Sequence, residues 1–201
     1  MTYQPTTISN DLTTLPKLPG WVTSSRPETL EPVAFRSGAA LTVLDQLVSV
    51  PRYGVPVRLL ANRLALRAAT ATSKLEGRLA READIRDAYH LTPPGEARGP
   101  DGELLGFWRE AVHVRTRGAG EIAELVGADF ASEVGVWINV GLECVWSHGP
   151  LAGCVAVLRA VLEVDDRAER VACLLSDIVL AWSLNWKVVL PVSAQRLAKT
   201  L

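Results

Sequence analysis

The segment from Arg58 to Leu91, RLLANRLALRAATATSKLEGRLAREADIRDAYHL, places side chains of different kinds on separate faces of a helix. Successive helical residues rotate by about 100°, so a helix over residues 58–79 gathers its small side chains into one ridge. Gly77 can interrupt or end this helix, or the helix can equally continue through it at a cost of about 1 kcal/mol. The ridge consists of Ala61, Ala65, Ala68, Ala69 and Thr72. A ridge of small residues lets a neighbouring helix approach closely. This pattern therefore predicts helix-on-helix packing.

The same helix predicts two polar features. Glu76 falls on the side of the small-residue ridge, where it faces protein and needs a cationic or hydrogen-bonding partner, because an unpaired buried charge is strongly unfavourable. Arg86 and Arg109 are the nearest candidates in the sequence. The opposite side of the helix carries a basic face formed by Arg63, Arg67, Lys74 and Arg78.

The rest of the chain is also helical in pattern. Residues 1–31 are rich in Thr, Ser and Pro and predict an extended N-terminal arm. Residues 32–201 predict a helical domain, with Asp129 as the N-cap of one helix and Asp165 or Asp166 as that of another. Besides 58–79, the expected helices are 32–49, 81–91, 103–117, 121–126, 130–147, 151–164, 167–186 and 192–201. The predicted fold is an all-α, single-domain multihelix bundle with an extended N-terminal arm.

Charge and hydropathy narrow the class of protein. The 201 residues are 48% hydrophobic with a net charge of −1, which suits one domain with a real core and argues against coating nucleic acid through overall charge. Residues 52–86 nevertheless contain eight Lys/Arg against three Asp/Glu, and residues 121–201 contain six against ten. The apolar surplus beyond residue 130 predicts central helices or an oligomer interface.

The cysteines and the N-terminus indicate the compartment. Cys144, Cys154 and Cys173 lie in apolar helical contexts without a C-x-x-C pair, so we expect buried free thiols in a reducing cytoplasm. We see no signal peptide and no apolar window long enough for a membrane span. A soluble cytoplasmic protein is expected.

Catalytic signals are sparse. Nucleotide-binding glycine motifs, the G-x-S-x-G element and zinc-protease spacing are missing, so no cofactor is expected. Cys144 and His148 lack further ligands at sensible spacing, and structural cysteines explain them better than a metal site or a nucleophile. The tryptophans of the predicted helices are expected to pack in a core or interface; they are Trp108, Trp137, Trp146, Trp182 and Trp186.

A polar cluster near residues 76–90 remains as a candidate enzyme site, centred on Glu76, Arg86 and His90. The alternative is a solvated helix surface, because Arg86 and His90 have the four-residue spacing of ordinary exposed pairs.

Three stretches carry a resemblance that covers most of the chain. FRSGAALTVLDQLV (35–48), RLALRAATATSKLEGRLAREADIRDAYHLTPPGEARGPDGELLGFWRE (63–110) and LLSDIVLAWSLNWKVVLPV (174–192) resemble the bacterial family called domain of unknown function 1403. The R-D-A-Y-H-L-x-x-P-G stretch is the most specific part. That family has no assigned activity, so the resemblance implies a helical bacterial protein and supplies no function. The arm before residue 30 lies outside this resemblance.

A shorter resemblance involves Thr72-Ser73-Lys74-Leu75-Glu76-Gly77, which is similar to the [S/T]-x-x-x-E-[G/N] inhibitory helix of Fic-type AMP transferases. In that family the glutamate pairs with a nucleotide-binding arginine and blocks productive ATP binding. The resemblance implies that Glu76 is the counterpart and that Thr72 opens the motif. The catalytic H-P-F-x-x-G-N-G-R element is missing, so this chain cannot itself be such an enzyme.

Three hypotheses follow. The leading one is a non-enzymatic helical protein that acts as a homo-oligomer or through a protein partner, without a membrane. The second is a regulatory, nucleic-acid-associated protein that uses the basic face. The third is an enzyme with the polar site around Glu76, Arg86 and His90.

Overall fold

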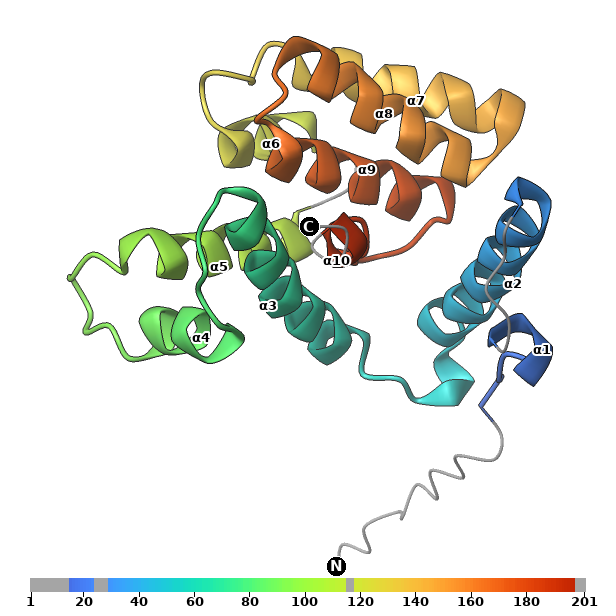
Figure 1. Ribbon diagram of the computed structural model, residues 1–201, viewed down its shortest axis with the longest axis horizontal. Coiled ribbons are helices and arrows are strands. Elements are labelled where there is room, and N and C mark those ends of the chain that lie inside the picture. Colours follow the sequence, from blue (N-terminus) through green and yellow to red (C-terminus); the bar gives the residue numbers. More distant parts are fainter. Residues whose placement is uncertain (1–14, 24–28, 115–117, 198–201) are drawn as a thin grey trace, which may run out of the picture. The chain divides into compact units, whose positions relative to one another are not determined.

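The structure is a computed structural model that describes residues 15–23, 29–114 and 118–197 (Figure 1). Over these ranges the regular secondary structure is helical and no strand occurs, which confirms the predicted all-α class. None of the described helices combines the length and the apolar character that a membrane crossing requires. The chain divides into two compact units, Met1–Pro56 and Val57–Leu201, which we describe separately.

The first unit contains α1 (Gly20–Thr23), α2 (Leu30–Ser49) and the 3-10 helix η2 (Pro51–Tyr53). α2 agrees with the helix predicted over residues 32–49, with Pro32 in its first turn, where a missing N–H has no cost. No residue of α2 is buried. The arm expected over residues 1–31 falls largely outside the described residues, and the described part contains α1. The boundary expected at residue 31 stays a prediction.

The second unit begins with α3 (Val57–Leu75). The predicted ridge of small residues is buried, as expected from close helix packing; its members are Ala61, Ala65, Ala68, Ala69 and Thr72. The helix ends at Leu75 rather than at residue 79, because Gly77 adopts a φ of +74° that turns the chain. Of the two alternatives for Gly77, the end of the helix is confirmed and the continuation to residue 79 is wrong, so Arg78 lies outside the helix.

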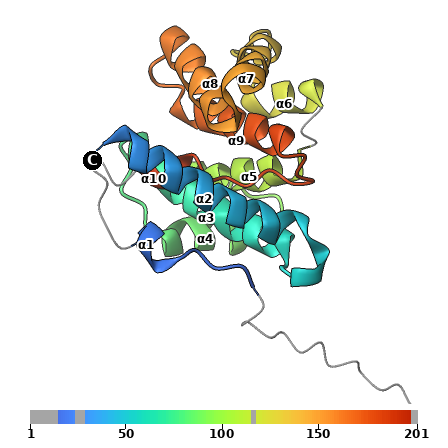
Figure 2. The ribbon, with the colours of Figure 1, turned by 90° about the vertical axis from the view of Figure 1, so that its right-hand side faces the viewer.

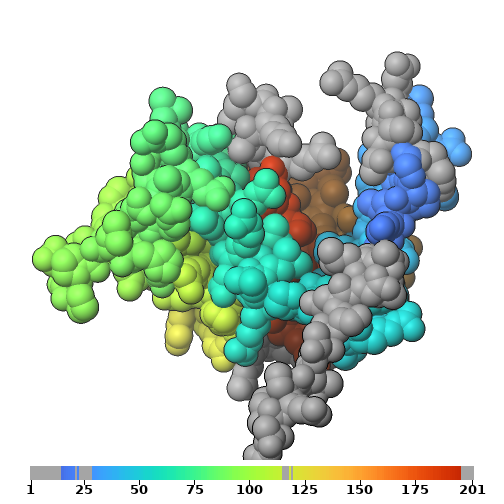
Figure 3. Space-filling model, turned by 90° about the horizontal axis from the view of Figure 1, so that it is seen from below, coloured from blue at the N-terminus to red at the C-terminus, as the bar shows by residue number. Residues whose placement is uncertain are grey.

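α4 (Glu82–His90) and α5 (Gly99–His113) form a pair that packs against α3. Seen from below in Figure 3, the green surface of α4 and α5 adjoins the teal surface of α3. Gly102 permits this packing, because a Cβ there would lie 2.9 Å from the carbonyl oxygen of Ala88. α5 begins four residues before the predicted start at residue 103, with Pro100 in its first turn.

The remaining helices are α6 (Ala119–Val126), α7 (Val134–His148), α8 (Pro150–Val164), α9 (Glu169–Ser183) and α10 (Ala194–Leu197). α9 packs against α7, α8 and α3, and the two ribbon views place it between the α7–α8 pair and the α3–α5 layer (Figures 1 and 2). Every residue from Val171 to Ala181 is buried. The apolar surplus beyond residue 130 is thus explained in large part by a central helix.

Several details of this half differ from the prediction. α7 starts at Val134 after a turn, so Asp129 is not its N-cap. Asp165 accepts a hydrogen bond from the backbone N–H of Arg167 instead of capping α9, whose N-cap is Ala168. Trp108, Trp137 and Trp186 are buried, whereas Trp146 is 89% exposed, so of the core or interface packing expected for Trp146 only the interface stays a prediction.

Candidate functional site

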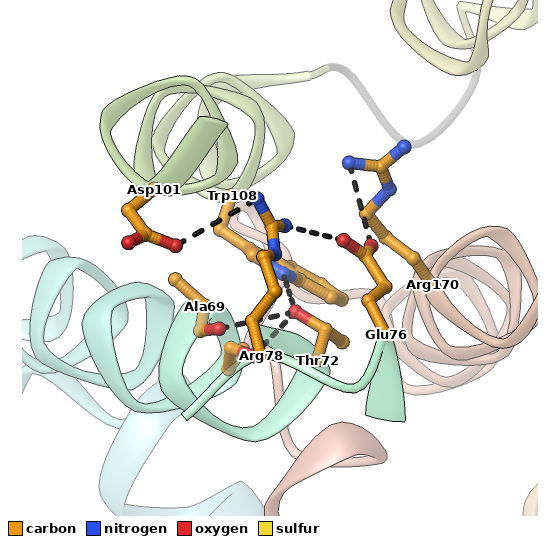
Figure 4. Close-up of polar contacts among 8 residues, drawn as sticks. Ala69, Thr72, Glu76, Arg78, Asp101, Trp108 and Arg170 are labelled. Carbon is orange, nitrogen blue, oxygen red and sulfur yellow. Dashed lines mark hydrogen bonds and ion pairs between the residues drawn. The ribbon is translucent and has the colours of Figure 1, made fainter. Parts of the chain in front are cut away.

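A cluster of charged side chains lies where α3 ends, and we call it the α3-end cluster: Glu76, Arg78, Asp101 and Arg170. Figure 4 shows these side chains converging from the turn after α3 and from α5 and α9. The guanidinium of Arg78 pairs with Glu76 and lies 3.7 Å from Oδ1 of Asp101. Nη1 of Arg170 lies 3.7 Å from the second oxygen of Glu76. The cluster joins three helices through one short turn.

The charges of the α3-end cluster cancel. Two guanidiniums face two carboxylates, and all four side chains are partly exposed, between 27% and 41%. Partly exposed ion pairs contribute little free energy each. A site for a free anion needs an excess of positive charge, which this arrangement does not have. Its physical effect is to fix the turn after α3 against α5 and α9.

A buried hydrogen-bonded pair lies beneath the cluster (Figure 4). The indole N–H of Trp108 donates to the hydroxyl of Thr72 at 3.0 Å, and that hydroxyl donates to the carbonyl oxygen of Ala68 at 2.8 Å. Both side chains have 0% exposure. A buried N–H without a partner is costly, so Thr72 stabilises the buried Trp108 side chain by accepting its hydrogen bond. The contact supports packing between α3 and α5.

The structure does not bring the predicted site residues Glu76, Arg86 and His90 together through any hydrogen bond or ion pair of the described residues. Arg86 pairs with Asp87 at 2.9 Å, and Nε2 of His90 lies 3.4 Å from Nη1 of Arg109. Glu76 was expected to pair with Arg86 or Arg109, and this prediction is wrong, because its partners are Arg78 and Arg170. The turn at Gly77 directs Glu76 towards other cations, one of which lies far away in sequence.

The basic face predicted on α3 is retained in part. Arg63, Arg67 and Lys74 are exposed, and none of them forms an ion pair within the described residues. α3 itself contains no acidic residue. Arg78 does not belong to this face, because it follows the end of the helix and pairs with carboxylates. The basic face therefore has three members.

The cysteines are free, as expected. Burial raises the pKa of Cys154 to about 11 and that of Cys173 to about 12, which keeps both thiols protonated and unreactive. Cys144 is only partly buried, contrary to the prediction, and its Sγ lies 4.0 Å from Nδ1 of His148. Over the described residues, no group of three His, Cys, Asp or Glu side chains could hold a metal ion.

Asp177 is a structural residue that was not predicted from the sequence. Its side chain is buried in α9, where Oδ1 accepts hydrogen bonds from the backbone N–H groups of Val192 and Ser193 at 3.2 and 3.0 Å and from the Ser193 hydroxyl at 2.8 Å. Oδ2 has no partner. Burial raises the pKa of Asp177 to about 7, against the opposing effect of these hydrogen bonds. The sequence feature that could have indicated a buried acid is the position of Asp177 within the apolar segment LLSDIVLAW.

Comparison with known proteins gives one finding. Residues 6–201 match a family model described as "Protein of unknown function (DUF1403)". The match begins at residue 6, so the arm before residue 30, which the resemblance left outside the family, is largely inside it. No curated protein and no solved structure matches the chain.

Proposed function

Given that the chain belongs to the family described as Protein of unknown function (DUF1403), we propose that it works without catalysis, as a helical protein that associates with a second copy of itself. One observation carries this proposal. α2 is an amphipathic helix of twenty residues, and none of them is buried. Apolar surface left in water is unfavourable by about 25 cal/mol per Å², so α2 has a strong tendency to bind a further apolar surface.

The apolar residues of α2 follow the spacing of a helix that pairs with another helix. Steps of three and four residues connect Leu30, Val33, Ser37, Ala40, Leu44 and Leu47, of which all but Ser37 are apolar. The opposite side carries Glu31, Gly38, Thr42, Gln46 and Ser49 together with one large apolar residue, Phe35. An alternation of three and four is the pattern of helices that pack side by side with interlocking side chains. The exposed fractions of Leu30 and Val33 are 82% and 39%.

A second α2 is the partner that fits this face best. A helix of twenty residues is about 30 Å long, which gives almost three repeats of seven residues. Such a stripe is self-complementary, because the same apolar positions meet when two copies align. Two exposed carboxylates or cations at its centre would oppose pairing, but the central positions are Ser37, Ala40 and Leu44.

Light scattering coupled to size exclusion tests the proposal on the full chain. We expect the wild-type chain to run as a dimer or a larger assembly, and the Leu44→Glu and Leu47→Glu variants to run as monomers, because each places a charge in the paired stripe. Thr42→Glu and Gln46→Glu are matched controls on the exposed opposite side of α2, and they should leave the assembly intact. A wild-type monomer at micromolar concentration would overturn the proposal.

The basic face of α3 favours a second candidate function, binding of a nucleic-acid backbone. Its support is that Arg63, Arg67 and Lys74 are exposed and unpaired within the described residues on a helix without acids. Phosphate contacts strengthen as salt falls. A gel shift at low salt should therefore detect binding that Arg63→Ala and Arg67→Ala weaken, while Arg159→Ala on α8 has no effect. No shift at low salt would eliminate this candidate.

The third hypothesis, an enzyme site formed by Glu76, Arg86 and His90, receives no support, because no hydrogen bond or ion pair of the described residues joins these side chains. We expect a bacterial protein of the cytoplasm. Three free cysteines support this expectation, since oxidising compartments favour disulfides.

A further inference from the structure

Tyr89 of α4 has a guanidinium from each of two arginines against its ring. Cζ of Arg98 lies 4.3 Å from the centroid of the Tyr89 ring, and Cζ of Arg109 lies 5.1 Å from it. Both guanidiniums therefore contact the same aromatic ring. The ring of His90 meets that of Tyr89 edge to face, with centroids 5.0 Å apart. We call these four residues the Tyr89 cluster.

The glycines of α5 explain why Arg98 reaches this position. A Cβ at Gly102 would collide with the Cβ of Arg98, and a Cβ at Gly106 would lie 3.8 Å from Nη1 of Arg98. The side chain of Arg98 therefore follows α5 as far as Gly106. Arg109 follows one turn later on the same helix, so α5 and the residue before it supply both guanidiniums that lie against the Tyr89 ring.

The positive charge of the Tyr89 cluster is not neutralised. Over the described residues, neither Arg98 nor Arg109 has a carboxylate within 4.0 Å, whereas Arg78 and Arg86 both do. Nη1 of Arg109 lies 3.4 Å from Nε2 of His90. A guanidinium can only donate, so this contact supplies no negative charge. Two guanidiniums that lack a carboxylate partner and lie against one aromatic ring are groups that can recognise an oxyanion.

We propose that Arg98 and Arg109, held against Tyr89 and flanked by His90, bind the phosphate monoester group of a small molecule. The two forked guanidiniums donate to the phosphate oxygens. A compact dianion fits better than a nucleic acid, because α4, α5 and their connection also carry exposed carboxylates, which would repel an extended polyanion. These carboxylates are Glu82, Asp84, Glu96, Glu103 and Glu110. The site is independent of the association proposed for α2.

Titration of the full chain with inorganic phosphate and with glycerol phosphate tests the site, with sodium chloride at equal ionic strength as the reference. The readout is the ¹⁵N chemical shift of the arginine side chains together with the thermal midpoint. We expect saturable shifts at Arg98 and Arg109. Because a charge-assisted hydrogen bond is worth about a factor of ten or more in affinity, Arg98→Gln or Arg109→Gln should weaken binding at least about tenfold.

Arg86→Gln is the matched control, since Arg86 is an exposed arginine of α4 that already pairs with Asp87. It should leave the affinity within about twofold of wild type. Arg98→Lys keeps the charge but loses the forked geometry, so its affinity should fall between those of wild type and Arg98→Gln.

Three outcomes would overturn the proposal. One is a response to phosphate no larger than the response to chloride. Another is an equal loss of affinity in Arg86→Gln and Arg98→Gln. The third is binding of a single-stranded oligonucleotide through these arginines without binding of either small phosphate, which would assign the cluster to nucleic acid instead.

Discussion

α9 and α2 are both apolar helices, yet their surroundings are opposite. Every residue of α9 from Val171 to Ala181 is buried, because α3, α7 and α8 of the same unit enclose it. No residue of α2 is buried, although its apolar positions recur at the same helical spacing. The comparison shows that an apolar stripe indicates how much of a helix surface favours burial. It does not indicate which helix, or which other molecule, packs against that surface.

The enclosure of α9 predicts the largest effect of a single substitution. Leu175 has 0% exposure, so Leu175→Ala should lower the free energy of unfolding by about 2–5 kcal/mol through lost burial and a residual cavity. Urea unfolding followed by circular dichroism measures this loss. A cost below about 1 kcal/mol would show that α9 is not enclosed as described and would remove the contrast with α2.

The buried acid of α9 predicts an unusual pH dependence. The pKa of Asp177 is raised to about 7 in the folded chain, from 3.8 in the unfolded chain. The folded state therefore binds a proton more tightly, and stability falls as the pH rises between about 4 and about 7. The loss can reach about 4 kcal/mol if the whole difference is expressed, at about 1.4 kcal/mol per pH unit.

Asp177→Asn tests this prediction, because the amide keeps an oxygen that accepts from Val192 and Ser193 but carries no charge. The downward slope of stability with pH should flatten in this variant. The exposed Asp166→Asn should retain the slope. A slope that persists in Asp177→Asn would assign it to another group.

The close contact between α7 and the α8–α9 layer predicts an intermediate effect. A Cβ at Gly141 would collide with Val157 and would lie 3.0 Å from Cγ2 of Val179. Gly141→Ala should therefore destabilise the chain by about 1–3 kcal/mol through overpacking. Gly135 of the same helix has nothing within 4 Å of such a Cβ, so Gly135→Ala should be stabilising by up to about 1 kcal/mol. Equal thermal midpoints for the two variants would contradict the packing described for α7.

Much of the fold was predictable because it follows from local periodicity. The small-residue ridge of α3 and the apolar run of α9 both identified helices and their buried faces. The predictions were less accurate at the ends of helices, where one or two residues determine the position at which the helix begins or ends. Gly77 adopts a positive φ and ends α3, whereas the sequence pattern was equally compatible with continuation through Gly77. The turn before Val134 likewise displaced the start of α7.

The candidate site was less predictable because its contacts connect distant parts of the chain. Glu76 was expected to need a cation, and it has two, but Arg170 belongs to a helix that begins almost a hundred residues later. His90 was expected to share a polar site with Glu76 and Arg86, but the side chain that lies near its Nε2 is Arg109, on the next helix. Residue types indicate which groups need partners, and only the packing decides which partners they obtain.

The smallest expected effect concerns α2 and completes the contrast with α9. Leu44→Ala removes the same atoms as Leu175→Ala, but Leu44 is only partly buried. At dilutions where the chain is monomeric, Leu44→Ala should cost less than about 1 kcal/mol of unfolding free energy, because few contacts are lost. At concentrations where the chain associates, the thermal midpoint of the wild type should rise with concentration and that of Leu44→Ala should rise less. A cost of about 2 kcal/mol or more at high dilution would mean that the chain's own helices cover this face, so that α2 resembles α9 after all.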